Sequence, residues 1–257
     1  MLDWNPALYG RYEDERTRPA AELLARVPLS GAMRAVDLGC GPGNSTELVA
    51  RRFPGAEVLG IDNSEAMLTA ARTRLPSARF EAGDIARWTP AAPDLIYANA
   101  ALQWVPGHET LIPRLFAALA PGGVLAIQMP DNRAEPTHRL MREVAAEPAW
   151  RDAIGDADRL RTELLPLAGY YDLLARDAAT VDVWHTIYQH PLASPAAIVE
   201  WVRATGLKPF VDRLTPALQA SYLAEYERRV ALAYPARADG RRLLAFPRMF
   251  IVARKAT

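Results

Sequence analysis

Short apolar runs alternate with amphipathic stretches through the first half of the chain, and this alternation is its strongest structural signal. Helical spacing of apolar positions predicts helices over residues 45–52 and 109–119. Five short segments around these helices predict strands, at residues 33–36, 58–61, 78–81, 94–97 and 124–129. Because strands that alternate with helices form βαβ units, the pattern predicts a parallel α/β sheet.

The second half of the chain has a looser rhythm. Residues 136–147 and 150–165 are predicted to be helical, and so is most of 194–233. Residues 181–190 alternate valine, tryptophan, threonine and tyrosine, which predicts a long strand, and 248–253 predicts a closing strand. Seven strands result, and a helical insertion of about 50 residues separates the last two.

Bulk properties argue against several classes of protein. The 257 residues carry 30 basic and 30 acidic side chains, whereas domains that bind nucleic acid are usually basic. No run of 18 apolar residues is present and the first residues lack a signal-peptide pattern, so we expect neither a membrane span nor secretion. The single cysteine, Cys40, excludes an internal disulfide and fits a protein of the reducing cytoplasm.

A glycine-rich loop over residues 37–44 joins the first predicted strand to the first predicted helix. Glycines at such a turn let the backbone bend sharply and approach a ligand closely. Gly39 and Gly41 begin the dinucleotide fingerprint G-x-G-x-x-G, but Asn44 stands in place of its third glycine. Asp37 would repel a pyrophosphate, whereas it suits a ligand with an ammonium group. S-adenosylmethionine carries such a group and no phosphate.

Acidic residues follow or end each of the first three predicted strands, at intervals of 25 and 22 residues: Asp37, Asp62 and Asp84. Because the carboxyl ends of parallel strands share one edge of a sheet, these carboxylates should face one ligand there. Asp62 is placed to accept the ribose hydroxyls and Asp84 to meet the adenine amine. The arrangement resembles the S-adenosylmethionine site of Rossmann-like methyltransferases. The predicted cofactor-binding residues are Asp37, Gly39, Cys40, Gly41, Gly43, Asp62, Asn63, Met67, Asp84, Ile85 and Asn99.

Several further stretches carry a more particular resemblance. They lie at residues 3–6, 8–9, 15–19, 23–28, 37–46, 102–104, 128–132, 135–138, 204–207, 244–248 and 250–254. On these residues the chain resembles the trans-aconitate 2-methyltransferase family over nearly its whole length. The resemblance implies S-adenosylmethionine-dependent methylation of one carboxylate of a small polycarboxylate, giving a monomethyl ester and S-adenosylhomocysteine.

The resemblance also implies a fold. We expect a seven-stranded Rossmann-like methyltransferase sheet, mostly parallel, with an antiparallel last strand beside the fifth and helices on both faces. No repeat or linker interrupts the chain, so we expect a single domain, 1–257, with an N-terminal cover segment at 1–30 and a cofactor-binding core at 31–130. Helical insertions at 131–180 and 191–243, after the fifth and sixth strands, are expected to form a lid.

Gln103 and Trp104 follow the fourth predicted strand, where the transferred methyl group should point in this fold. Their amide and indole N–H groups can hold a carboxylate without protonating it. A carboxylate is ionised at neutral pH and needs no general base, so we expect catalysis by alignment and exclusion of water. Cations or several donors must hold the other carboxylates. The candidate substrate-binding residues are Tyr9, Arg133, His138, Tyr170, Trp201, Arg203 and Arg248.

Three other functions remain open at this point. A methyltransferase for another carboxylate, hydroxyl or amine acceptor would share the cofactor site, although a phenol would need a base or a metal. A nicotinamide oxidoreductase is disfavoured by Asp37 and Asn44. A non-catalytic S-adenosylmethionine-binding module would carry the same loop. We expect no metal, a small-molecule partner rather than nucleic acid or a membrane, and a monomer or weak homodimer.

Overall fold

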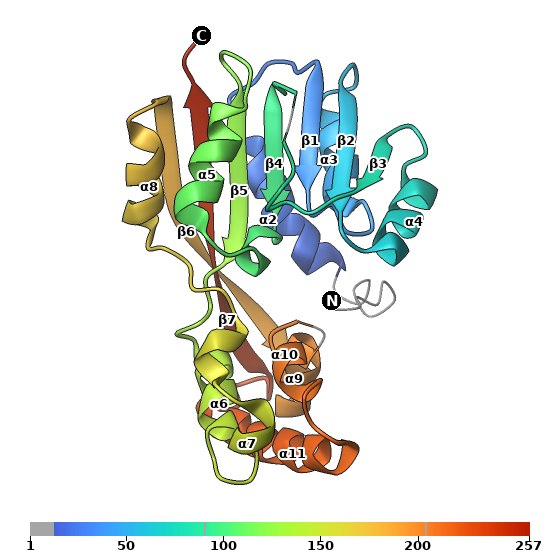
Figure 1. Cartoon of the computed structure of the whole chain (residues 1–257). Coiled ribbons are helices and arrows are strands. Elements are labelled where there is room, and N and C mark those ends of the chain that lie inside the picture. The colour runs from blue at the N-terminus through green and yellow to red at the C-terminus, as the bar shows by residue number, and fades with distance from the viewer. Residues whose placement is uncertain (1–12, 90, 204) are drawn as a thin grey trace. The chain divides into compact units, whose positions relative to one another are not determined.

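The structure is a computed structural model that describes residues 13–89, 91–203 and 205–257. Seven strands form one sheet in the order β3-β2-β1-β4-β5-β7-β6 (Figure 1). The strands are β1 (Arg34–Leu38), β2 (Glu57–Asp62), β3 (Arg79–Ala82), β4 (Leu95–Asn99), β5 (Val124–Pro130), β6 (Ala178–Leu192) and β7 (Arg242–Lys255). The described helices are α2 (Glu13–Ala25), α3 (Asn44–Arg52), α4 (Glu65–Arg74), α5 (His108–Ala117), α6 (Pro136–Ala145), α7 (Arg151–Ile154), α8 (Leu167–Ala175), α9 (Pro195–Arg203), α10 (Lys208–Val211) and α11 (Pro216–Ala233), with 3₁₀ turns η1 (Leu102–Trp104) and η2 (Ala157–Leu160).

The strand order confirms the predicted sheet. β1 pairs in parallel with both β2 and β4, so Asp37 lies opposite Gly60 on one side and Tyr97 on the other. β3 and β5 extend the sheet in parallel, and β7 lies between β5 and β6 and runs antiparallel to β5 (Figure 1). The strand order reverses between β1 and β4, which is where open α/β sheets bind ligands at their carboxyl edge.

The chain divides into two compact units. Unit 1 takes in residues 1–129, 163–185 and 249–257, and unit 2 takes in 130–162 and 186–248. Unit 1 therefore holds β1 to β4 and β5 as far as Met129, with α2 to α5 and α8. Unit 2 holds η2 and the remaining described helices, which come from the two predicted insertions. The long strands β6 and β7 each begin in one unit and end in the other.

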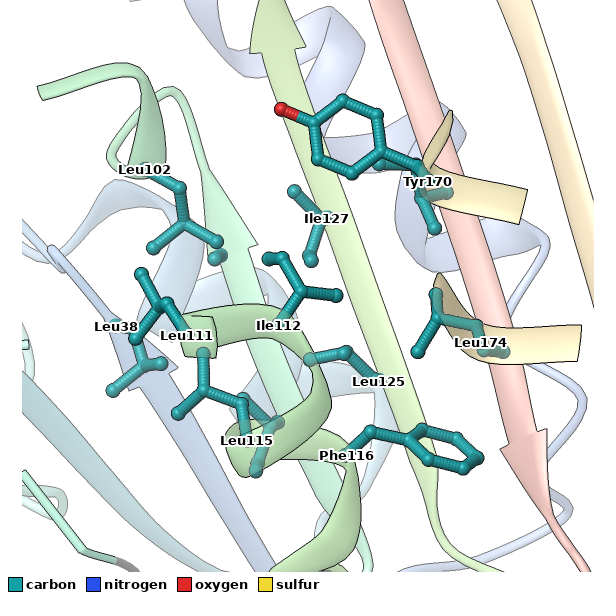
Figure 2. Close-up of a cluster of buried hydrophobic side chains, with 14 of the residues drawn as sticks. Leu38, Leu102, Leu111, Ile112, Leu115, Phe116, Leu125, Ile127, Tyr170 and Leu174 are labelled. Atoms are coloured by element: carbon teal, nitrogen blue, oxygen red, sulfur yellow. The ribbon is translucent and has the colours of Figure 1, made fainter. Parts of the chain in front are cut away.

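Helices cover both faces of the sheet in unit 1, with α5 and α8 on one face and α2 and α3 on the other (Figure 1). Figure 2 shows the cluster beneath α5, where Leu111, Ile112, Leu115 and Phe116 project toward β4, β5 and α8. Their spacing gives α5 a single apolar stripe, as expected for a helix that packs on a sheet. Six of the seven residues of β5 are buried, which is typical of a central parallel strand.

The core of unit 2 is built where α11 packs on α6. Tyr222 and Tyr226 are fully buried on α11 and donate their hydroxyls to the carbonyl oxygens of Met141 (2.8 Å) and Thr137 (3.1 Å). Thr215 caps the start of α11, because its hydroxyl accepts the backbone N–H of Leu218 at 3.5 Å. The apolar rings thus fill the core while their polar tips satisfy backbone groups of α6.

Several element boundaries differ from the sequence prediction. Residues 150–165 do not form one helix, because Gly155 adopts φ 78° and ends α7 after Ile154. β1 begins at Arg34 and continues through Leu38, so Asp37 lies within the strand instead of after it. α2 and α8 were missed, and β7 is much longer than predicted.

Candidate active site

The loop between β1 and α3 places three glycines in the left-handed region, with φ 69° at Gly39, 54° at Gly41 and 90° at Gly43. A Cβ at Gly39 would lie 2.3 Å from Cβ of Ala101, and one at Gly43 would lie 3.2 Å from Cα of Ala71. A Cβ at Gly41 would meet nothing within 4 Å. Gly39 and Gly43 therefore permit close packing of the protein on itself, whereas Gly41 faces open space where a ligand can approach the backbone.

Asp62 braces this loop from the end of β2. Its Oδ2 accepts the backbone N–H of Gly41 at 2.9 Å, and its Oδ1 accepts that of Ser64 at 2.9 Å. The carbonyl oxygen of Ile61 accepts the N–H groups of Gly39 (2.7 Å) and Cys40 (3.0 Å). One carboxylate thus fixes two turns, and because it is only partly buried each oxygen still has a lone pair for a ligand hydroxyl.

Asp37 is fully buried at the end of β1. Its Oδ2 accepts the hydroxyls of Ser45 and Thr46, both at 2.7 Å, from the first turn of α3. Its Oδ1 has no hydrogen-bond partner in the described part of the chain. Burial raises the pKa of Asp37 to about 6, against the lowering effect of the two hydroxyls. A buried carboxylate with an unused oxygen is receptive to a cationic donor.

The loop after β4 presents two more unused oxygens. Asn99 Oδ1 and Gln103 Oε1 are buried and have no partner among the described residues. The Gln103 amide is anchored through Nε2, which donates to the carbonyl oxygen of Ala100 at 2.6 Å. Ala100 itself has φ 53°, a strained conformation for a residue with a Cβ. The ends of β1 and β4 and the adjoining turn η1 thus present three acceptor oxygens that a ligand with hydrogen-bond donors can satisfy.

Gln103 and Trp104 lie on η1, and the buried side chains of His108 and Tyr170 support this turn. The Nε2 atom of His108 lies 2.9 Å from the carbonyl oxygen of Leu102, and its Nδ1 lies 2.5 Å from the hydroxyl of Tyr170. Because a carbonyl oxygen only accepts, the imidazole proton lies on Nε2 and the Tyr170 hydroxyl donates to Nδ1. Tyr170 was a candidate substrate ligand, but the structure places it fully buried in the core of unit 1, where it supports η1 instead.

The remaining predicted cofactor residues lie around the same edge. Burial raises the pKa of the Cys40 thiol far above its ordinary range, so it is a packing group. Met67 is buried on α4, whereas Ile85 is partly buried after β3. Asn63 and Asp84 are exposed, and Asp84 Oδ1 accepts the backbone N–H of Ala86 at 2.9 Å.

The candidate substrate residues in unit 2 do not form one group. Arg248 is buried, with its guanidinium 5.0 Å from the Phe246 ring centroid, and Trp201 is buried against His190 at 4.5 Å between ring centroids. Arg133 pairs with Asp158 elsewhere in unit 2, and Arg203 is exposed. Tyr9 lies outside the described residues.

His138, a candidate substrate-binding residue, carries no positive charge at neutral pH. It is buried on α6 with Nδ1 3.0 Å from the Thr137 hydroxyl. Burial, and then the charges of Arg161 and Arg142, hold its pKa well below the ordinary value. The imidazole is therefore neutral at neutral pH. The charges that act on His138 come from Arg142 and Arg161, which the sequence analysis did not single out, although Arg142 follows His138 by one helical turn on α6.

No group of three or more His, Cys, Asp or Glu side chains is placed to hold a metal ion in residues 13–89, 91–203 and 205–257. Within the same ranges no helix is long and apolar enough to cross a membrane.

The fold and the loop define a Rossmann-like methyltransferase, and the family profile described as "Methyltransferase domain" matches residues 35–123. The chain is 80% identical to a trans-aconitate 2-methyltransferase of Variovorax paradoxus (strain S110), over 99% of both chains. It is 73% identical to a trans-aconitate 2-methyltransferase of Paracidovorax citrulli (strain AAC00-1), over 100% of both. The chain belongs to the trans-aconitate 2-methyltransferase family.

A solved structure shares the fold at much lower identity. It is phosphoethanolamine N-methyltransferase 2 of Haemonchus contortus, in complex with S-adenosyl-L-methionine. The match has a TM-score of 0.55 and 18% identity, and covers 93% of this chain and 53% of that chain. At this identity the likeness supports the fold alone.

The buried carboxyl of Asp37 makes the stability of the unliganded protein depend on pH. Because burial raises its pKa to about 6, the charged form destabilises the fold at pH 7, and protonation removes this cost as pH falls. Between pH 7 and pH 5 the free energy of unfolding should rise by roughly 1 kcal/mol relative to Asp37→Asn, which cannot titrate. Urea denaturation of both proteins at each pH measures the difference, and equal pH slopes would contradict it.

Proposed function

We propose that this chain transfers the methyl group of S-adenosylmethionine to one carboxylate of trans-aconitate, giving a monomethyl ester and S-adenosylhomocysteine. The activity is that for which its full-length relatives are named. The observation in this chain that carries the proposal is the set of unpartnered acceptors at the ends of β1 and β4: Asp37 Oδ1, Asn99 Oδ1 and Gln103 Oε1. A ligand with an ammonium group supplies the donors that these oxygens lack.

The residues of unit 1 fit the cofactor. Asp37 and Asn99 would hold its ammonium group, and Gly41 leaves the space for close approach of the ligand to the loop. Asp62 would accept the ribose hydroxyls with its remaining lone pairs. Met67, Asp84 and Ile85 would border the adenine, and Gly39, Cys40, Gly43 and Asn63 shape the two turns around it. When bound, S-adenosylmethionine supplies an electrophilic methyl group on a sulfonium.

The chain's own contribution to catalysis is positioning. The acceptor carboxylate, with a pKa near 4, is ionised at neutral pH, so no residue has to remove a proton. Trp104 and the second N–H of the Gln103 amide, whose first N–H donates to Ala100, would orient the reacting oxygen, because His108 and Tyr170 hold η1 in place. Alignment of reacting atoms can lower a barrier by about 7–11 kcal/mol. Exclusion of water would favour a reaction that neutralises the carboxylate.

The location and the partners of the enzyme are also part of the proposed function. We propose that it acts in the cytoplasm, as a monomer or weak homodimer, on a free small molecule, and without a nucleic-acid or membrane partner. Its neutral charge balance and single cysteine support this view. The helices of unit 2, on insertions after β5 and β6, are proposed to act as a lid.

The proposed acceptor class is tested by ranking substrates. With methyl-labelled S-adenosylmethionine, trans-aconitate should give the highest kcat/KM, followed by cis-aconitate, citrate and isocitrate. Mass spectrometry should locate the label in a base-labile ester. Higher activity on a phenol or an amine would contradict a carboxyl acceptor, and cofactor binding without any product would favour a non-catalytic module.

Replacing Asp62 tests the cofactor site. Asp62→Ala should weaken S-adenosylmethionine binding at least tenfold, because hydrogen bonds to a charged group contribute about 1.5–3 kcal/mol each. Isothermal titration calorimetry measures the affinity directly. Glu65→Ala is the matched control, since Glu65 lies three residues away and pairs on the surface with Arg72. Equal affinities for the two variants would refute the assignment of Asp62.

Replacing Trp104 and His138 tests catalysis by positioning. Trp104→Phe removes the indole donor and should lower kcat, whereas His138→Gln should leave kcat within threefold because a buried neutral imidazole transfers no proton. Steady-state kinetics from pH 7 to pH 9 should show a flat kcat for wild type. A thousandfold loss of kcat in His138→Gln with an unchanged KM would show instead that this histidine takes part in the chemistry.

A further inference from the structure

Three arginine residues lie near one another in unit 2, and two of them bind the carboxylate of Asp158. Arg133 follows β5, Arg142 lies on α6, and Arg161 follows η2. The Nη2 of Arg133 lies 3.1 Å from Asp158 Oδ1, and the Nε of Arg142 lies 3.0 Å from the same oxygen. Two guanidinium groups therefore share one carboxylate oxygen.

Arg161 completes the group from the neighbouring turn. Its Nη1 donates to Asn132 Oδ1 at 3.3 Å, just beyond the end of β5. Burial, and then the charges of Arg133 and Arg142, lower the pKa of Arg161 to about 10. Burial and Arg133 likewise lower the pKa of Arg142. The hydrogen bond of Arg161 to Asn132, the residue before Arg133, places its guanidinium beside the same segment of chain.

The arginines are held in place by backbone groups. Arg142 Nη1 donates to the carbonyl oxygens of Arg133 and His138, both at 3.0 Å. Arg133 Nη2 also donates to the carbonyl oxygen of Asp158 at 3.1 Å. Carbonyl oxygens fix the orientation of a guanidinium without neutralising its charge. The neighbouring acid Glu143 is paired with Arg139 at 2.6 Å on the outer side of α6.

Asp158 is a weakly held counter-ion. It lies on η2, a turn of four residues, and its side chain is 71% exposed. An exposed carboxylate gains little from an ion pair, because water solvates it well when the pair is broken. A small anion with two or three carboxylates would bring more negative charge to the same guanidinium groups, and guanidinium binds carboxylates in a bidentate manner.

We propose that Arg133, Arg142 and Arg161 form the binding site for carboxylates of the acceptor, and that Asp158 occupies this site as an internal substitute that the acceptor displaces. The inference rests on the proposed function, since it takes the acceptor to be a polycarboxylate. The exchange replaces one set of ion pairs by another and forms no covalent bond.

Steady-state kinetics with saturating S-adenosylmethionine tests the proposal, because the arginine and aspartate variants should change the KM for trans-aconitate in opposite directions. Arg142→Gln and Arg161→Gln should each raise the KM for trans-aconitate at least tenfold with kcat within threefold. Asp158→Asn should lower that KM several-fold, because the internal competitor loses its charge. Arg139→Gln is the matched control on the same helix, since Arg139 is exposed and paired with Glu143, and its KM should equal that of wild type.

A binding measurement separates the site from the reaction. Calorimetric titration of trans-aconitate should show the same order of affinities, with Asp158→Asn tightest. Arg142→Lys and Arg161→Lys keep the positive charge but lose the bidentate hydrogen-bonding geometry of guanidinium, so they should bind trans-aconitate with intermediate affinity. They replace the glutamine variants in this test if a glutamine variant fails to fold. Unchanged KM in both arginine variants, or a raised KM in Asp158→Asn, would overturn the inference. A wild-type enzyme that forms no ester would instead overturn the proposed function.

Discussion

The burial of one carboxylate at the end of the central strand is the constraint on which the site depends. Asp37 can lie there only because the first turn of α3 returns over β1 and brings two hydroxyls to Oδ2. That return requires a loop with left-handed backbone at three positions, which glycine allows at little cost. Asp62 then fixes the loop from the end of β2. One oxygen of Asp37 is nevertheless left without a protein partner, and its position is set before any ligand arrives.

Each unit contains polar or charged groups to which a ligand could bind. In unit 1 the unused groups are acceptors: Asp37, Asn99 and Gln103. In unit 2 the guanidinium groups of Arg133 and Arg142 share one exposed carboxylate, that of Asp158. A cationic cofactor and an anionic acceptor would each complete one of these arrangements. Catalysis by positioning needs groups that are held rigidly in advance, and the His108–Tyr170 pair beneath η1 supplies such support.

The central sheet and the positions of Asp37 and Asp62 at one edge of it could be predicted from the sequence. Buried parallel strands are short apolar runs, and their carboxyl ends share one edge, so Asp37 and Asp62 could be placed by their distance along the chain alone. The family resemblance supplied the antiparallel position of β7. Helical periodicity did not reveal that Gly155 breaks residues 150–165, because a single left-handed residue leaves the surrounding apolar pattern intact.

The substrate side could not be predicted in the same way. Tyr170 and His138 were chosen because they are polar residues on the predicted insertions. In the structure Tyr170 is buried away from solvent, and burial keeps His138 neutral. Arg142 and Arg161 are two among 30 basic residues, and only the folded chain brings them together. Such a cluster depends on contacts between segments far apart in sequence, which carry no local pattern.

The central claim is that the unused oxygen of Asp37 awaits the ammonium group of S-adenosylmethionine. The most direct measurement is the pKa of Asp37. It can be determined by ¹³C NMR of the protein with carboxyl-labelled aspartate, titrated with and without the cofactor. The Asp37→Asn variant assigns the signal. A nearby positive charge stabilises the carboxylate, so the pKa should fall from about 6 by at least about one unit on binding. A pKa that stays the same or rises when S-adenosylmethionine binds would contradict the account.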